Sequence, residues 1–177
     1  MEKVAKARAF AIAAHSAAGQ VRKYTGEPYH VHPAEVAQIV TARGGDQAQI
    51  CAAWLHDVVE DTAVTNELIE TEFGKDVAEL VGWLTDVSKP EDGNRAERKA
   101  IDREHTAQAP KRAKFVKLAD LSSNTKSIVE HDAKFAKVYL AEKRLLLEEA
   151  LFDADPVLLA EVYRLLEEGE AALQLAK

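Results

Sequence analysis

Apolar residues recur along this chain at the spacing of helices rather than strands. Near the start, Val4, Ala7, Ala11 and Ala14 follow one another three or four residues apart, which predicts a helix from about Glu2 to Ala18. Almost no stretch alternates between apolar and polar positions, as a half-buried strand would. The pattern therefore predicts an all-α protein.

Turn and capping residues divide this pattern into segments. Gly19 ends the first helix, and a loop over residues 20–32 follows, with Gly26 and Pro28 as helix breakers and Pro33 opening the second helix. Asp46 caps a further helix, which carries His56, and Thr65 caps a short one that runs as far as Gly74. Three more helices are expected from Lys75 to about Val87, from Arg95 to about Gln108, and from Pro110 through residue 130. Two leucine-rich helices finish the chain, the last with Asp155 as its cap and Pro156 as its first residue. No repeat, low-complexity tract or linker interrupts them, so residues 1–177 are predicted to form a single domain.

The segment WLHDVVED, residues 54–61, has an unusual polar face. On a helix its apolar residues share one arc, and the opposite arc carries His56, Asp57, Glu60 and Asp61. A carboxylate in apolar surroundings is costly unless it is paired, hydrogen-bonded or bound to a metal. Acids on a helix are more often simply solvated, so this segment alone leaves the role of its polar face open.

Composition narrows the class of partner. The net charge of −7 argues against nucleic acid as the main partner. The stretch from Lys89 to Lys117 is locally basic, however, so a small polyanion can be bound there. No segment is long and apolar enough to span a membrane, and Arg8 and His15 interrupt the alanine-rich start in a way that favours a folded helix over a signal peptide. We therefore expect a cytoplasmic protein with no membrane partner; the sequence does not fix its oligomeric state.

The single cysteine rules out an internal disulfide. Cys51 lies on the apolar arc of the helix that leads into residues 54–61, and this position predicts a small core residue rather than a nucleophile.

Candidate metal ligands also occur outside residues 54–61. His32 stands directly before Pro33, and VKLADLSSNT places Asp120 in an otherwise apolar helix, on one stripe with Lys117 and Asn124. Two imidazoles and two carboxylates form a mixed nitrogen and oxygen set that suits Mn²⁺ or Fe²⁺ and also accepts Zn²⁺ or Co²⁺. The candidate ligands are His32, His56, Asp57 and Asp120.

Three motifs carry a family resemblance. RKYTGEPYHVHP, WLHDVVEDT and VKLADLSSNT, in this order, resemble the signatures of the HD-domain hydrolases that cleave the 3′-diphosphate of the alarmones ppGpp and pppGpp, releasing pyrophosphate. The match runs from about Ala14 to Ile128, and the length resembles that of the small alarmone hydrolases rather than the bifunctional enzymes. The resemblance implies a helical HD fold with the metal site between helices, a nucleotide substrate and a metal, most simply Mn²⁺, held by the four residues already selected.

The same resemblance suggests roles for further residues. Glu60 and Asp61 follow His56 and Asp57 by one helical turn each, so both acids can orient or deprotonate the attacking water or protonate the leaving oxygen. Of the two, Glu60 is the expected general base. The expected substrate contacts are Arg22, Lys23, Arg95 and Asn124.

The chain departs from the family pattern after Asp120. Bifunctional relatives continue with arginine, leucine and histidine, whereas this chain has Leu121, Ser122 and Ser123 before the asparagine. This difference leaves substrate identity open. His30, at a position that is commonly apolar in the family, is expected to be a loop residue, and His15 a hydrogen-bonded structural residue.

Two alternative functions follow from the same residues. An HD-fold phosphohydrolase acting on other nucleotides would use the same site. A non-catalytic nucleotide sensor would be expected to lack at least one ligand or water-activating acid, whereas the full set is present here.

Overall fold

The computed structural model describes residues 2–175, and it is helical, as the sequence predicts. Within these residues the only β-type pairing is an isolated bridge between Val21 and Pro28. No helix among them is both long and apolar enough to cross a bilayer. The chain divides into two compact units that meet in sequence between Thr85 and Asp86, and each is described by itself.

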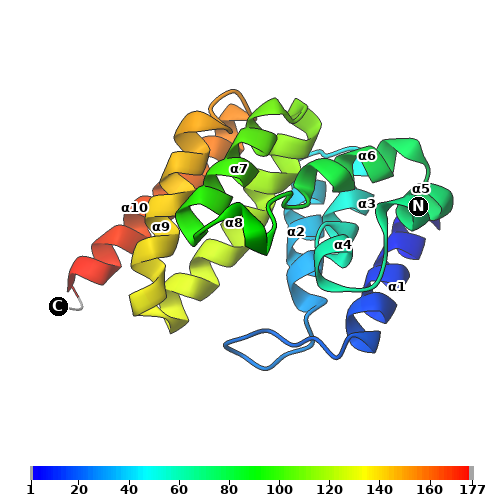
Figure 1. Cartoon of the computed structure of the whole chain (residues 1–177), viewed down its shortest axis with the longest axis horizontal. Coiled ribbons are helices and arrows are strands. Elements are labelled where there is room, and N and C mark those ends of the chain that lie inside the picture. The colour runs from blue at the N-terminus through cyan, green and yellow to red at the C-terminus, as the bar shows by residue number, and fades with distance from the viewer. Residues whose placement is uncertain (1, 176–177) are drawn as a thin grey trace. The chain divides into compact units, whose positions relative to one another are not determined.

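The first unit is arranged around one central helix. Its elements are α1 (Glu2–Ala17), α2 (Val31–Ala42), α3 (Gln47–Leu55), α4 (Val58–Asp61), α5 (Asn66–Phe73) and α6 (Lys75–Leu84) (Figure 1). Helix α3 packs against α1, α2 and α6, and α5 packs against α6. Consistent with this central place, every residue from Cys51 to Leu55 is buried, and Cys51 is a fully buried core residue as predicted.

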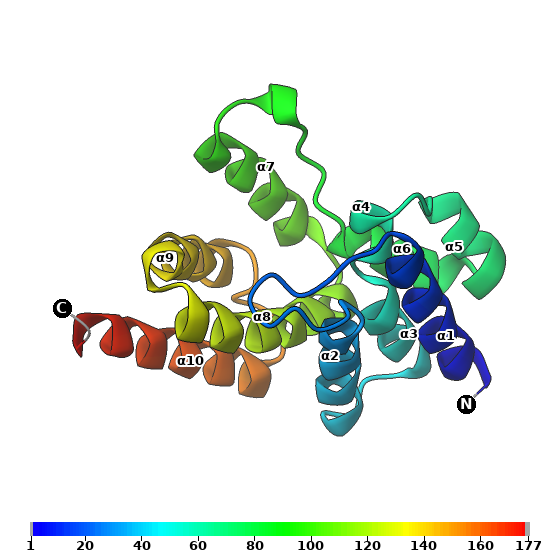
Figure 2. The same cartoon turned by 90° about the horizontal axis from the view of Figure 1, so that it is seen from below.

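The second unit is built on three long helices. Its elements are a short 3₁₀ turn η1 (Pro90–Asp92), α7 (Arg95–Gln108), α8 (Lys111–His131), α9 (Ala133–Glu149) and α10 (Pro156–Leu175). Helix α10 packs along α8 and α9 (Figure 2), and α7 packs on α9. Gly169 permits the close approach, because a Cβ atom there would lie 2.9 Å from Val129 Cγ2 and 3.3 Å from Leu140 Cδ1.

Local side-chain caps fix the helix starts. Asp46 accepts hydrogen bonds from the backbone N–H groups of Ala48 and Gln49, and its own backbone N–H donates to Oε1 of Gln49. Thr65 caps α5 and Asp155 accepts from the Leu158 N–H at the start of α10. These three caps agree with the sequence-based prediction.

Three helix boundaries differ from the prediction. Helix α2 begins at Val31, ahead of Pro33, because proline is tolerated in the first turn, where its missing N–H leaves no intrahelical bond unmade. Helix α6 ends at Leu84 rather than Val87, since Thr85 already has extended backbone angles. The helix expected to run unbroken through residues 54–61 is interrupted after Leu55 and resumes at Val58 as α4.

Candidate metal centre

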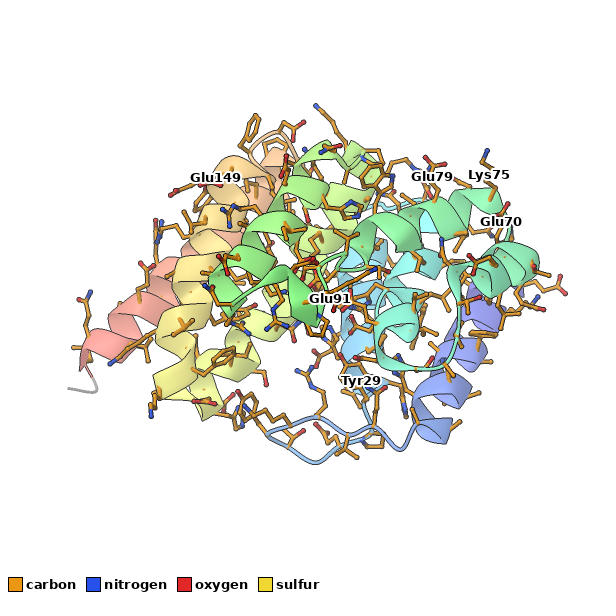
Figure 3. The ribbon with its side chains drawn as sticks, viewed as in Figure 1. Tyr29, Glu70, Lys75, Glu79, Glu91 and Glu149 are labelled. Carbon is orange, nitrogen blue, oxygen red and sulfur yellow. The ribbon has the colours of Figure 1, made fainter. Side chains whose placement is uncertain are left out.

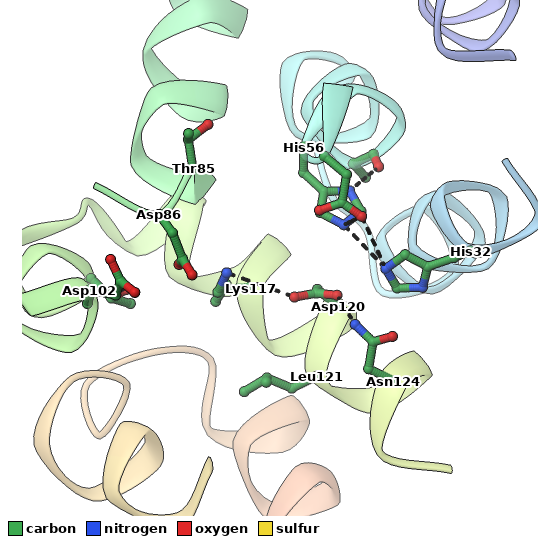
Figure 4. Close-up of polar contacts among 12 residues, drawn as sticks. His32, His56, Thr85, Asp86, Asp102, Lys117, Asp120, Leu121 and Asn124 are labelled. Atoms are coloured by element: carbon green, nitrogen blue, oxygen red, sulfur yellow. Dashed lines mark hydrogen bonds and ion pairs between the residues drawn. The ribbon is translucent and has the colours of Figure 1, made fainter. Parts of the chain in front are cut away.

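Three side chains of the first unit bring their ligand atoms together (Figure 4). His56 Nε2 lies 3.3 Å from His32 Nε2 and 3.2 Å from Asp57 Oδ2, which is itself 3.7 Å from His32 Nε2. All three atoms lie within 4.8 Å of one another. Both histidines are buried, at 1% exposure for His32 and 2% for His56. The structure thus unites three of the four ligands selected from the sequence.

The helix interruption explains how two consecutive residues face one point. On a regular helix the side chains of neighbours diverge by about 100°. His56 ends α3 with helical angles, and Asp57 follows at φ −94° and ψ −5°, in the sparsely populated region beside the helical one. This turn between α3 and α4 aims both side chains toward His32, which lies in the first turn of α2.

The hydrogen bonding of His56 favours its role as a ligand. Its Nδ1 lies 2.8 Å from the carbonyl oxygen of Ala53 and donates to it, so Nε2 carries the lone pair and points toward His32 and Asp57. Two nitrogens bound to one ion at about 2.1 Å, roughly 90–110° apart, would lie about 3.0–3.4 Å from each other. The observed separation of 3.3 Å fits this arrangement. The three side chains therefore suit a divalent cation.

A tyrosine that the sequence analysis did not select completes this cluster. The Tyr29 hydroxyl donates a 2.6 Å hydrogen bond to Asp57 Oδ2 and also hydrogen-bonds to Asp61. Tyr29 comes from the loop between α1 and α2 (Figure 3), and its ring lies 4.8 Å from that of His15. Tyr29 lies three residues before His32 within the motif RKYTGEPYHVHP, and this position was the feature of the sequence that could have indicated its role.

Hydrogen bonds link Asp61, one of the two predicted acids, to this cluster. Partial burial of its carboxyl group and the nearby Asp57 raise the pKa of Asp61, while hydrogen bonds from Gln20 and Tyr29 oppose the shift. Gln20 Oε1 in turn lies 2.6 Å from Nδ1 of His15, which is 1% exposed, in keeping with the structural role expected for this histidine. Both acids lie in the short helix α4, and both residues are exposed.

The loop that carries Arg22 and Lys23, between α1 and α2, is held by backbone hydrogen bonds. The Arg22 N–H donates to the Glu27 carbonyl at 2.7 Å, and the Gly26 N–H donates to the Arg22 carbonyl at 2.9 Å. Gly26 has φ +72°, which a side chain would disfavour, so glycine suits this turn. Arg22 is partly buried, whereas Lys23 is exposed and places its amine 3.3 Å from the Tyr24 hydroxyl.

Asp120, in the second unit, is held by the stripe that the sequence predicted. It is 7% exposed, its Oδ1 accepts a 2.7 Å hydrogen bond from Asn124, and its Oδ2 lies 3.9 Å from the Lys117 amine (Figure 4). The three residues lie one turn apart along α8, which confirms the predicted spacing. Asn124 therefore orients the carboxylate. The role of Asp120 as a fourth metal ligand stays a prediction.

Arg95, predicted to bind substrate, is engaged within its own unit. Its guanidinium donates to both carboxylate oxygens of Glu142, at 2.7 and 2.9 Å, and lies 5.3 Å from the ring centre of Phe135. The Glu142 hydrogen bonds raise the pKa of Arg95, which favours its charged form. This partner lies 47 residues away in sequence, so no local pattern reveals it.

Comparison with known proteins defines the class. The model of the HD domain family matches residues 7–145, and the chain belongs to this family. A probable guanosine-3′,5′-bis(diphosphate) 3′-pyrophosphohydrolase of Synechocystis is 40% identical over 128 residues, 71% of this chain but 16% of its own length. The enzyme of the same designation from Xenopus tropicalis is 43% identical over 103 residues, which are 57% of this chain and 56% of its own.

A solved structure gives the same relationship. It is described as a metazoan ortholog of SpoT that hydrolyses ppGpp and plays a role in starvation responses. It superposes with a TM-score of 0.80 at 28% identity, covering 93% of this chain and 95% of its own. The predicted resemblance to HD-domain proteins and to alarmone hydrolases is thereby confirmed. The chain spans only 16% and 56% of the lengths of the Synechocystis and Xenopus relatives.

Proposed function

We propose that this protein hydrolyses the 3′-diphosphate of ppGpp and pppGpp, releasing pyrophosphate together with GDP or GTP. The observation that carries the proposal is the convergence of His32, His56 and Asp57, whose ligand atoms lie within 4.8 Å of one another. The family of the chain and the designations of its relatives support the choice of substrate. On the grounds of its composition, we place the enzyme in the cytoplasm.

The proposed cofactor is a divalent cation, with Mn²⁺ preferred and Fe²⁺, Co²⁺ or Zn²⁺ as alternatives. His32, His56 and Asp57 would hold it, and Asp120 is taken as the fourth ligand from the sequence resemblance. Such an ion supplies positive charge for the phosphoryl oxygens and makes a nearby water more acidic. Tyr29 fixes the Asp57 carboxylate through its 2.6 Å hydrogen bond.

The proton transfers are proposed to fall to the two acids of α4. Glu60 is proposed as the general base that accepts a proton from the attacking water. Asp61, held by Gln20 and Tyr29 beside Asp57, is proposed to orient this water or to protonate the 3′-oxygen as it leaves. These hydrogen bonds support a fixed position for the Asp61 carboxylate.

The substrate carries a second diphosphate on the 5′ side, which needs cations of its own. Arg22 and Lys23, in the loop before His32, and Arg95 are proposed to meet the phosphates or the base, because arginine suits forked contact with phosphate and stacking on a base. Since Glu142 accepts from Nε and Nη2 on one edge of Arg95, a phosphate at this place must share the guanidinium or displace the carboxylate. Asn124, besides orienting Asp120, is proposed to lie near the substrate.

One observation favours a second candidate. Leu121, Ser122 and Ser123 replace the arginine, leucine and histidine that bifunctional relatives carry, and all three positions are buried in α8. The missing cation and imidazole are compatible with an HD-fold phosphohydrolase that acts on other nucleotides.

The two candidates differ in their response to a substrate panel. Purified protein with Mn²⁺ is tested against ppGpp, a nucleoside 3′-monophosphate and nucleoside 5′-triphosphates, with His56→Ala as the metal-site control. The alarmone proposal predicts the highest kcat/KM for ppGpp and loss of both bound metal and turnover in the control. If the parent protein hydrolyses another nucleotide but not ppGpp, the result would favour the second candidate. Unchanged metal content in His56→Ala would refute the proposed site.

A further inference from the structure

The second unit contains a polar pocket that the proposed metal centre leaves unused. It lies among α7, α8, α9 and the segment before η1. Its cavity volume is about 60 Å³, which admits several waters or one tetrahedral oxyanion but not a nucleoside. The charged residues that line it are Asp86, Lys99, Asp102, Arg103, Lys117, Glu142 and Lys143.

The carboxylates of this pocket are already compensated. Lys99 bridges Asp86 and Asp102, and Glu142 is held by Arg95 through two hydrogen bonds. Asp102 is further stabilised by hydrogen bonds from the backbone and hydroxyl of residue 88. The three carboxylates that line the pocket therefore have cationic partners other than Lys143.

Lys143 differs from the other cations of the pocket. Within residues 2–175 no carboxylate lies within ion-pair distance of its amine, which is 5.2 Å from the ring centre of Tyr139. Burial, followed by the neighbouring charge of Lys117, lowers the pKa of Lys143 to about 8. An ammonium group has three donors and is costly to remove from water without acceptors. An oxyanion in the pocket would supply these acceptors.

Lys117 joins the pocket to Asp120, the proposed fourth metal ligand. It lines the pocket, and its amine lies 3.9 Å from Oδ2 of Asp120. A divalent cation bound by Asp120 would compensate that carboxylate. An anion in the pocket would then meet the positive charges of Lys117 and Lys143.

Resting on the function proposed above, we propose that Lys117 and Lys143 bind the terminal phosphate of the substrate's 3′-diphosphate in this pocket. The phosphorus under attack would lie at the ion that Asp120 helps to hold. The terminal phosphate, one bridging oxygen further on, would meet Lys117, which lies beside Asp120 and lines the pocket. Lys143 is thus a specificity residue that distinguishes a 3′-diphosphate from a 3′-monophosphate.

Paired substrates test this assignment. kcat/KM is measured for ppGpp and for guanosine 5′-diphosphate 3′-monophosphate in the parent, in Lys143→Met and in Lys143→Arg, with Lys134→Met on the exposed face of α9 as the matched control. Loss of one charged hydrogen bond should lower the ppGpp value about tenfold or more in Lys143→Met. The monophosphate value should change less than about twofold, and Lys143→Arg should recover part of the loss. Equal losses for both substrates would overturn the assignment.

A binding measurement separates this inference from the proposed function. Calorimetric titration of the Mn²⁺-loaded protein with pyrophosphate needs no turnover. Pyrophosphate affinity should fall about tenfold in Lys143→Met and stay unchanged in Lys134→Met. If the parent protein hydrolyses neither nucleotide, the proposed function is refuted. The titration then still tests whether Lys143 binds phosphate in the pocket. Equal pyrophosphate affinities in Lys143→Met and Lys134→Met would refute the pocket assignment.

Discussion

Replacing Lys143 by methionine should stabilise the protein at neutral pH. In the folded chain its pKa is lowered to about 8, against an ordinary value of 10.5, chiefly by burial. At about 1.4 kcal/mol for each pH unit, the protonated amine costs the fold up to about 3 kcal/mol at pH 7. Because the side chain is partly exposed, screening by water reduces this cost, and we expect a gain of about 1–3 kcal/mol. Methionine keeps the apolar packing over Tyr139 without the charge.

The pH dependence of the free energy of unfolding follows from the lowered pKa of Lys143. Between pH 8 and 10.5 the unfolded chain holds a proton on Lys143 that the folded chain has lost, so the stability of the parent rises with pH through this window. The advantage of Lys143→Met should accordingly shrink, by about half or more, between pH 7 and pH 9.5. The groups that face Lys143 are present in both proteins, so a pH dependence of their own is common to the parent and the variant; they are Lys99, Lys117, Asp86 and Asp120.

Urea unfolding in phosphate-free buffer at both pH values measures the effect. Lys134→Met, on the same helix but exposed, should leave the free energy of unfolding within about 0.5 kcal/mol of the parent. A Lys143→Met protein that is less stable than the parent at pH 7 would refute the reasoning. So would an advantage that stays constant with pH.

Three further outcomes follow from the structure. Glu60→Gln and Asp61→Asn should keep the bound metal, measured by elemental analysis, while kcat falls about a hundredfold or more for at least one of them. Near-normal turnover in both variants would mean that these acids are solvated surface residues with no catalytic role. Arg95→Ala should lower kcat/KM for ppGpp more than for a simple 3′-nucleotide, by about tenfold, and equal losses would argue against contact with the second diphosphate. Gly169→Ala should lower the free energy of unfolding by about 1–3 kcal/mol, because its Cβ would lie 2.9 Å from Val129 Cγ2; an unchanged urea midpoint would contradict this close packing.

Features determined by neighbouring residues were predictable from the sequence. The caps at Asp46, Thr65 and Asp155 were predicted correctly, because a cap depends on residues two or three positions away. The alignment of Lys117, Asp120 and Asn124 likewise follows from the helical repeat alone. The residue types of the candidate metal centre were predictable for a chemical reason, since buried imidazoles and carboxylates need compensation.

Features that depend on tertiary contacts were missed. The helical repeat through residues 54–61 is continuous, and nothing local signals the interruption at His56 and Asp57 that turns both side chains toward His32. The hydrogen bond from Tyr29 to Asp57 joins residues 28 positions apart, and the pairing of Arg95 with Glu142 joins residues 47 apart. Helix periodicity says nothing about such contacts.

The proposed cleavage position can be tested directly with labelled water. Purified protein, Mn²⁺ and ppGpp are combined in ¹⁸O-enriched water, and the products are analysed by mass spectrometry. Attack of water on the phosphorus next to the 3′-oxygen predicts GDP without label and pyrophosphate carrying one ¹⁸O atom. Labelled orthophosphate, label in the GDP, or no consumption of ppGpp by metal-loaded protein would contradict the proposed hydrolysis.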